Sequence, residues 1–171
     1  MNVNFLRVWL RAWALITVVD ATFATVYPVV AHGQPLGRVW QGVASVLLGP
    51  GAVDRGARTI AFGLVMHAAV ALVWTTVFLA LALASPLLRR IVATPAGIVV
   101  VSALYGPLIW TVMSMVVISR LVGRPVVITP QWWVQLAAHI PFVALPIVAT
   151  IGRGLRSAPV VADAHPVGDA V

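Results

Sequence analysis

Three ionisable side chains stand inside long apolar stretches of this 171-residue sequence: Asp20, His67 and His139. A carboxylate or an imidazole inside a membrane span is costly, so each such residue marks a candidate functional site. One carboxylate and two imidazoles suit a proton relay or a divalent transition metal. Two histidines on facing helices could also be the axial ligands of haem b. No spacing motif selects one of these chemistries.

The depths of the three residues agree with one another. At about 1.5 Å per helical residue, and counting from one face of a bilayer, Asp20 lies roughly 17 Å deep. His67 lies roughly 12 Å deep and His139 roughly 10 Å deep on the same count. The sequence therefore predicts that three helices place these groups in one slab of the bilayer.

Helical spacing adds polar neighbours to this predicted cluster. Thr17 and Tyr27 share a stripe with Asp20, and Gln135 shares a face with His139. The simplest interpretation is a hydrogen-bonded Asp20–His67 pair that fixes helix register, with His139 bonded to Gln135 or to a carbonyl. A metal ion, if one binds, would use Asp20, His67 and His139, whereas no cofactor is expected. The predicted cluster is Asp20, His67, His139, Thr17, Tyr27 and Gln135.

The elements that must position these residues follow from composition and from apolar runs. The chain is 61% hydrophobic and only 9% charged, too few charges to cover a surface that faces water. Apolar runs predict four membrane-crossing helices near residues 9–31, 56–84, 94–120 and 130–152. Thr94-Pro95 and Thr129-Pro130 are typical of helix starts, and Trp132 and Trp133 are expected as anchors at the membrane surface.

The connection between the first two spans carries a further amphipathic stretch near residues 35–48. We expect an interfacial helix there, with Arg38 and Gln41 toward water and Trp40 among the lipid headgroups. The alternative is a short helix packed on the bundle. The predicted fold is thus an all-α four-transmembrane-helix bundle with one interfacial helix, a single domain over residues 1–156. Residues 157–171 are expected to be a disordered tail.

Charge and terminal features bear on location and partners. The eleven basic residues are all arginines at the ends of apolar runs, which favours lipid headgroups over nucleic acid despite the net charge of +7. The N-terminal run resembles a signal peptide, but Asp20 interrupts it, so a retained first span is expected. We predict a multi-pass protein of the bacterial inner membrane with both termini cytoplasmic. The expected partners are the lipid bilayer and either further copies of the chain or a larger membrane complex.

Several residues of the predicted spans also match the pattern of a known protein family. Asp20, the Gly63-Leu64-Val65-Met66-His67 element, Tyr105-Gly106 followed by a Met-rich turn, and an early His139 in the last span form a pattern. In these features the chain resembles a family of uncharacterised bacterial four-span membrane proteins, and more distantly the YagU-like inner-membrane proteins. It departs from that family at Ser114, where an Asn is usual. The resemblance implies the four-span topology and supplies no activity.

Function follows less directly. The sequence contains no GxSxG, HExxH, P-loop or dinucleotide-binding fingerprint and no pair of intramembrane carboxylates, so we expect no enzyme. The first hypothesis is a structural, accessory or stress-related membrane protein with a buried Asp/His cluster. The alternative is a small proton-coupled transporter or oligomeric channel that uses Asp20 and the intramembrane histidines. A haem- or metal-binding membrane subunit is a third possibility.

Overall fold

The structure is a computed structural model that describes residues 3–156. All secondary structure in that range is helical. Four stretches are long and apolar enough to cross a membrane: Phe5–His32, Ala57–Ala84, Pro95–Val122 and Pro130–Arg156. The predicted all-α architecture with four long apolar helices is confirmed, with bounds within a few residues of those expected. The tail predicted over residues 157–171 lies outside the described residues.

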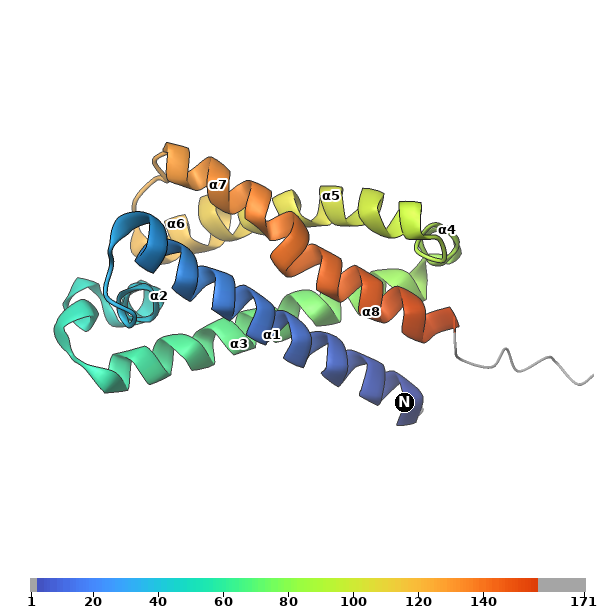
Figure 1. Cartoon of the computed structure of the whole chain (residues 1–171), viewed down its shortest axis with the longest axis horizontal. Helices are drawn as coiled ribbons and strands as arrows, with labels where there is room; N and C mark the ends of the chain where they lie inside the picture. The colour runs from blue at the N-terminus through green and yellow to red at the C-terminus, as the bar shows by residue number, and fades with distance from the viewer. Residues whose placement is uncertain (1–2, 157–171) are drawn as a thin grey trace, which may run out of the picture.

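The four long stretches run in alternating directions between two ends of the molecule (Figure 1). The first and second are the single helices α1 (Val3–His32) and α3 (Ala57–Ala84). The third and fourth are each interrupted by a π-helical segment, in which backbone hydrogen bonds join residues five apart instead of four. Their parts are α5 (Pro95–Thr111), η2 (Val112–Ile118), α6 (Ser119–Val122), α7 (Pro130–His139), η3 (Ile140–Ala144) and α8 (Leu145–Arg156).

Two short helices lie across the ends of the bundle, where Figure 1 shows them nearly end-on. Helix α2 (Arg38–Leu48), followed by the 3-10 turn η1 (Pro50–Asp54), lies at the end where α3 begins. Helix α4 (Pro86–Ile91) lies at the opposite end, between α3 and α5. Helix α2 confirms the predicted short helix, although it begins at Arg38 after a turn at Pro35. Helix α4 was not predicted.

Helix starts follow the expected capping chemistry. The Thr94 hydroxyl accepts a hydrogen bond from the Gly97 N–H at 3.0 Å, and the Thr129 hydroxyl accepts one from the Trp132 N–H at 3.3 Å. Both predicted starts are therefore confirmed. Ser85 caps α4 in the same way, because its hydroxyl accepts from the Leu88 N–H at 3.1 Å. Ser85-Pro86 is thus the signal that could have predicted α4.

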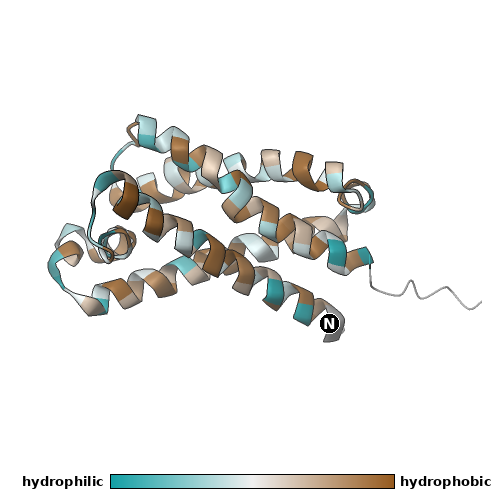
Figure 2. Ribbon diagram, viewed as in Figure 1, coloured by the Kyte–Doolittle hydropathy of each residue, from teal (hydrophilic) through white to brown (hydrophobic). Residues whose placement is uncertain are grey.

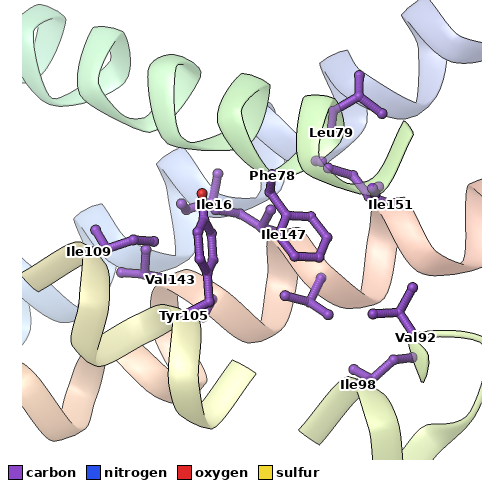
Figure 3. Packing of buried hydrophobic residues seen from close by; sticks show 14 of the residues in the cluster. Ile16, Phe78, Leu79, Val92, Ile98, Tyr105, Ile109, Val143, Ile147 and Ile151 are labelled. Atoms are coloured by element: carbon purple, nitrogen blue, oxygen red, sulfur yellow. The ribbon is translucent and has the colours of Figure 1, made fainter. Parts of the chain in front are cut away.

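The apolar core lies toward the end of the bundle that carries α4. Phe78 of α3, Ile16 of α1 and Ile147 of α8 are each exposed by 2% or less and belong to one cluster of buried hydrophobic side chains (Figure 3). Tyr105 of α5 joins them, and its hydroxyl donates to the Trp74 carbonyl at 2.7 Å. All four long stretches therefore contribute to one core.

The outer surface of the long helices is also apolar. Figure 2 shows hydrophobic residues along their lengths and most of the hydrophilic residues toward the two ends. Val18, Val65 and Leu104, on three different helices, are exposed by 65%, 67% and 70%. A water-soluble bundle of this size would bury or replace such side chains, because contiguous apolar patches are rare on soluble monomers.

Candidate functional site

Asp20 of α1 and His67 of α3 face each other across the interface of these two helices. Asp20 Oδ2 lies 3.8 Å from His67 Nε2, and the two side chains are only 18% and 14% exposed. This separation is longer than a hydrogen bond. His67 Nε2 is buried and has no hydrogen-bond partner among the described residues. The predicted pairing is therefore present as a close electrostatic contact, and the predicted hydrogen bond is absent.

Helix α2 covers His67 from a third side. The Trp40 ring centroid lies 5.2 Å from that of His67, edge to face, and Trp40 is only 4% exposed. The expectation that Trp40 lies among the headgroups is wrong, because its indole packs inside the protein. This packing depends on Gly63, where an added Cβ would lie 2.0 Å from the Trp40 carbonyl oxygen. Hence α2 packs closely on α3 of the bundle.

His139 has its own set of partners. Its Nδ1 donates to the backbone carbonyl of Gln135 at 2.7 Å. A bond from His139 to Gln135 or to a carbonyl was expected, and the carbonyl of Gln135 is the acceptor. The Trp110 ring lies 4.9 Å from the His139 ring. Gly106 allows α5 to approach closely, since a Cβ there would lie 2.6 Å from the His139 carbonyl oxygen. His139 is thus engaged between α5 and the fourth span.

The two remaining predicted neighbours of Asp20 bond elsewhere. The Thr17 hydroxyl donates to the Trp13 carbonyl in its own helix at 2.8 Å. The Tyr27 hydroxyl donates to Gln131 Oε1 of α7 at 3.1 Å. Neither hydroxyl is hydrogen-bonded to Asp20, whereas the backbone of Thr17 interacts with His67, the residue that faces Asp20.

A second buried polar contact links the third and fourth spans. Trp132 Nε1 donates to the Ser114 hydroxyl at 3.1 Å, and Trp132 is 7% exposed. Trp132 is therefore not the surface anchor that was expected. Trp133 is 57% exposed and fits that expectation.

The structure does not gather the predicted residues into one metal centre. Over residues 3–156, no group of three His, Cys, Asp or Glu side chains could hold a metal ion. Two surface hollows have volumes of about 520 and 550 Å³, and Asp20 lines neither. Among the described residues, Asp20 and His67 are thus in direct contact. His139 is hydrogen-bonded elsewhere, but His67 lies near enough to interact with it electrostatically.

Sequence reasoning missed four residues of this region: Trp40, Trp110, Gln131 and Ser114 as a hydrogen-bond acceptor. Tryptophan in the short amphipathic helix and at the start of the fourth span was expected at the membrane surface, although Trp40 and Trp132 are buried inside the protein. A signal was present for Trp40, because Gly63 on α3 predicts a close neighbour. No signal in one helix's spacing identifies Gln131 as the partner of Tyr27.

Comparison with known proteins identifies no relative. No protein-family model matches the chain, and no curated protein or solved structure shows significant similarity to it. The resemblance to four-span bacterial membrane proteins therefore stays a prediction.

Proposed function

We propose that this chain is a multi-pass integral membrane protein whose four long helices cross the bilayer. The observation that carries the proposal is the exposed apolar surface on all four helices, each of 27 or 28 residues. About 20 apolar residues suffice to cross the hydrocarbon core, so each helix is long enough. In water this surface would cause aggregation, whereas in lipid it costs nothing.

The bacterial inner membrane is the location that we propose, with both termini in the cytoplasm. Alternating helices place the start of α1 at Val3 and the end of α8 at Arg156 at one end of the bundle (Figure 1). That end carries six arginines and the other end five, which agrees in sign with the excess of basic residues on the cytoplasmic side. The six are Arg7, Arg11, Arg89, Arg90, Arg153 and Arg156.

For the role of the protein we propose a structural or accessory one, without catalysis. The support is that several intramembrane polar groups contact different partners rather than converging on one centre. His139 bonds a carbonyl of its own helix, Trp132 bonds Ser114, and Asp20 faces His67. Polar contacts distributed in this way hold neighbouring helices in register, because each buried polar group requires a partner nearby.

One observation favours the alternative, a proton-coupled transporter or channel. His67 Nε2 is buried 3.8 Å from a carboxylate oxygen and has no hydrogen-bond partner in residues 3–156. A proton shared between these atoms, or a water between them, would satisfy both groups. Such a pair could change its charge during a transport cycle.

Reconstitution distinguishes the two roles. The purified protein and its Asp20→Asn variant are placed in liposomes that contain a pH-sensitive dye, and a membrane potential is imposed with valinomycin. For a structural role we expect proton entry equal to that of protein-free liposomes for both proteins. Proton entry through the wild type that is lost in Asp20→Asn would establish the alternative. Carbonate extraction of native membranes tests insertion separately, since an inserted protein stays in the pellet.

A further inference from the structure

An elongated apolar groove lies on the outside of α1, beside the fourth span. Helix α1 packs on α8 and η3, and its C-terminal end is linked to α7 through the Gln131 side chain. The groove has a volume of about 550 Å³ and is lined by four turns of α1, from Val18 to Ala31, together with Phe142 of η3. Pockets for small ligands have volumes of this order.

Stacked aromatic rings form one wall of the groove. Phe23 lies 4.4 Å from Phe142 with nearly parallel rings, and Tyr27 lies 5.5 Å from Phe23. Phe142 belongs to the π-helical segment η3, and such segments are frequent at functional sites. The wall therefore joins α1 and η3.

Polar groups lie just beyond the end of the groove nearest the C-terminus of α1, next to the lining residues Tyr27 and Ala31 and not in the lining itself. Gln131 Oε1 accepts from the Tyr27 hydroxyl at 3.1 Å and lies 3.2 Å from His32 Nε2. The Gln131 side chain also carries an amide group with two N–H donors. His32 is the last residue of α1, so in a membrane these donors would lie near the headgroups.

The dimensions of the groove fit one leaflet. From Val18 to Ala31 the helix rises about 20 Å at 1.5 Å per residue. Half of the hydrocarbon core measures about 15 Å, which is the depth that one acyl chain occupies. The apolar part of the groove is thus long enough for a single acyl chain, with donors at the end where ester and phosphate oxygens lie.

A second copy of the chain fits less well. Close helix contacts in membranes favour Gly, Ala, Ser and Thr, whereas this lining is mostly valine and aromatic side chains and has no glycine. In addition, only 6% of the most apolar window of α1 is buried, against 22–33% for the other three spans. The groove is therefore lined by bulky side chains on a helix that the rest of the chain leaves largely uncovered.

We propose that this groove binds one glycerophospholipid, with an acyl chain along α1 against Phe23 and Phe142 and with its polar oxygens beyond the Tyr27 end of the groove, beside Gln131 and His32. The proposal rests on the membrane insertion proposed above. It adds a defined lipid site to a helix that would otherwise contact only freely exchanging lipid.

Native mass spectrometry of protein purified in a mild detergent and supplied with dioleoyl phosphatidylglycerol tests this site. Val26→Trp and Val30→Trp each place an indole in the groove. Val26 is 51% exposed and Val30 is 79% exposed. Val99→Trp, on α5 outside the groove and 59% exposed, is the matched control. Size-exclusion chromatography and circular dichroism confirm that each variant is folded.

We expect one retained lipid on the wild type and on Val99→Trp. The lipid-bound fraction should fall about tenfold in the groove variants, because overpacking a filled site typically costs a few RT. Equal retention by all four proteins would overturn the proposal. So would loss of a dimer in Val26→Trp without a change in lipid, since the occupant would then be a second copy. Extraction of the chain by carbonate would instead contradict membrane insertion itself.

Discussion

At the scale of single residues, Asp20 and His67 differ from the other polar side chains of the long helices. Most hydroxyl groups there donate to the carbonyl four residues earlier in the same helix, which satisfies them without a neighbour. Residues of this kind are Thr17, Thr22, Thr25, Thr75, Thr76 and Ser102. Asp20 has no such local bond, so its interaction with His67 determines its contribution to stability.

Substitutions at Asp20 should therefore depend on whether the new side chain can still interact with His67. Asp20→Asn keeps the shape and the hydrogen-bonding capacity, so we expect a loss of stability below about 1 kcal/mol. Asp20→Leu removes the polar group that faces His67 Nε2, and we expect a loss of about 1–3 kcal/mol. Thermal unfolding in detergent measures both effects.

Thr22→Leu is the control for Asp20→Leu, because Thr22 bonds only a carbonyl of its own helix. We expect it to change stability little. A double-mutant cycle of Asp20→Leu with His67→Leu isolates the pair, and the two losses should not be additive. Additive losses, or an Asp20→Leu variant as stable as the wild type, would mean that the contact contributes nothing.

How much of the site was predictable depends on what sequence spacing reveals. Counting residues from a helix end gives depth, and this count correctly brought Asp20 and His67 together. It gives no information on how neighbouring helices diverge. Tyr27 shares a stripe with Asp20, but α1 has separated from α3 by that point and Tyr27 meets Gln131 of α7 instead. The rotation of each helix about its own axis depends on packing along its whole length. The spacing of residues within one helix carries no information on that packing.

At the scale of secondary-structure elements, α2 is the helix whose role changes most. Sequence periodicity predicted a helix here. Its length predicted that it does not cross the membrane, because the run is too short to span a bilayer. Periodicity did not give the side on which it packs. That side is determined by Gly63, which lets the α2 backbone at Trp40 approach α3 closely.

A pair of glycine substitutions should separate packing of α2 from its helical propensity. Gly63→Ala would place a Cβ 2.0 Å from the Trp40 carbonyl oxygen, so α2 must move, and we expect a loss of about 1–3 kcal/mol. Gly42→Ala lies within α2 with no atom closer than 4 Å to the added Cβ, so we expect a gain of about 0.5–1 kcal/mol. Thermal unfolding measures both changes.

Hydrogen exchange locates the effect of the first substitution. We expect the backbone amides of α2 (Arg38–Leu48) to exchange faster in Gly63→Ala, whereas those of α5 should be unchanged. If Gly63→Ala stabilises the protein as Gly42→Ala does, α2 does not pack on α3 through a close contact between Gly63 and the Trp40 backbone.

The π-helical segments are the elements that no sequence pattern predicted. Pro141 has no N–H to donate, so the helix cannot keep its regular bonding through η3. Whether a proline then produces a kink, a break or a widened turn depends on the neighbouring helix. Here the neighbour is α5, whose Gly106 contacts the backbone at His139 directly before η3.

At the scale of the whole molecule, the three intramembrane ionisable groups and the apolar core occupy different halves of the bundle. The buried apolar core lies toward α4, whereas Asp20, His67 and His139 lie in the half toward α2. This separation agrees with the common depth that was predicted for the three residues. The number of long helices was also predictable, because bilayer thickness fixes the length of an apolar run that can cross it.

Orientation in the membrane is the property for which sequence carries the weakest signal, and labelling of single cysteines tests it together with the topology. The chain has no cysteine, so each introduced thiol reports one position. The exposed residues Arg38 and Arg124 lie at the α2 end, and Arg7 and Arg90 lie at the α4 end. Arg90 is preferable to Arg89, whose guanidinium donates to the last carbonyls of α3.

With a membrane-impermeant maleimide added to intact spheroplasts, we expect Arg38→Cys and Arg124→Cys to be labelled. Arg7→Cys and Arg90→Cys should react only after permeabilisation, because the end with more arginines is expected in the cytoplasm. The reverse result would keep four crossings and invert the orientation. Labelling of Arg38→Cys and Arg90→Cys from the same side would contradict the four-span topology, since α3 alone connects these two positions across the bilayer.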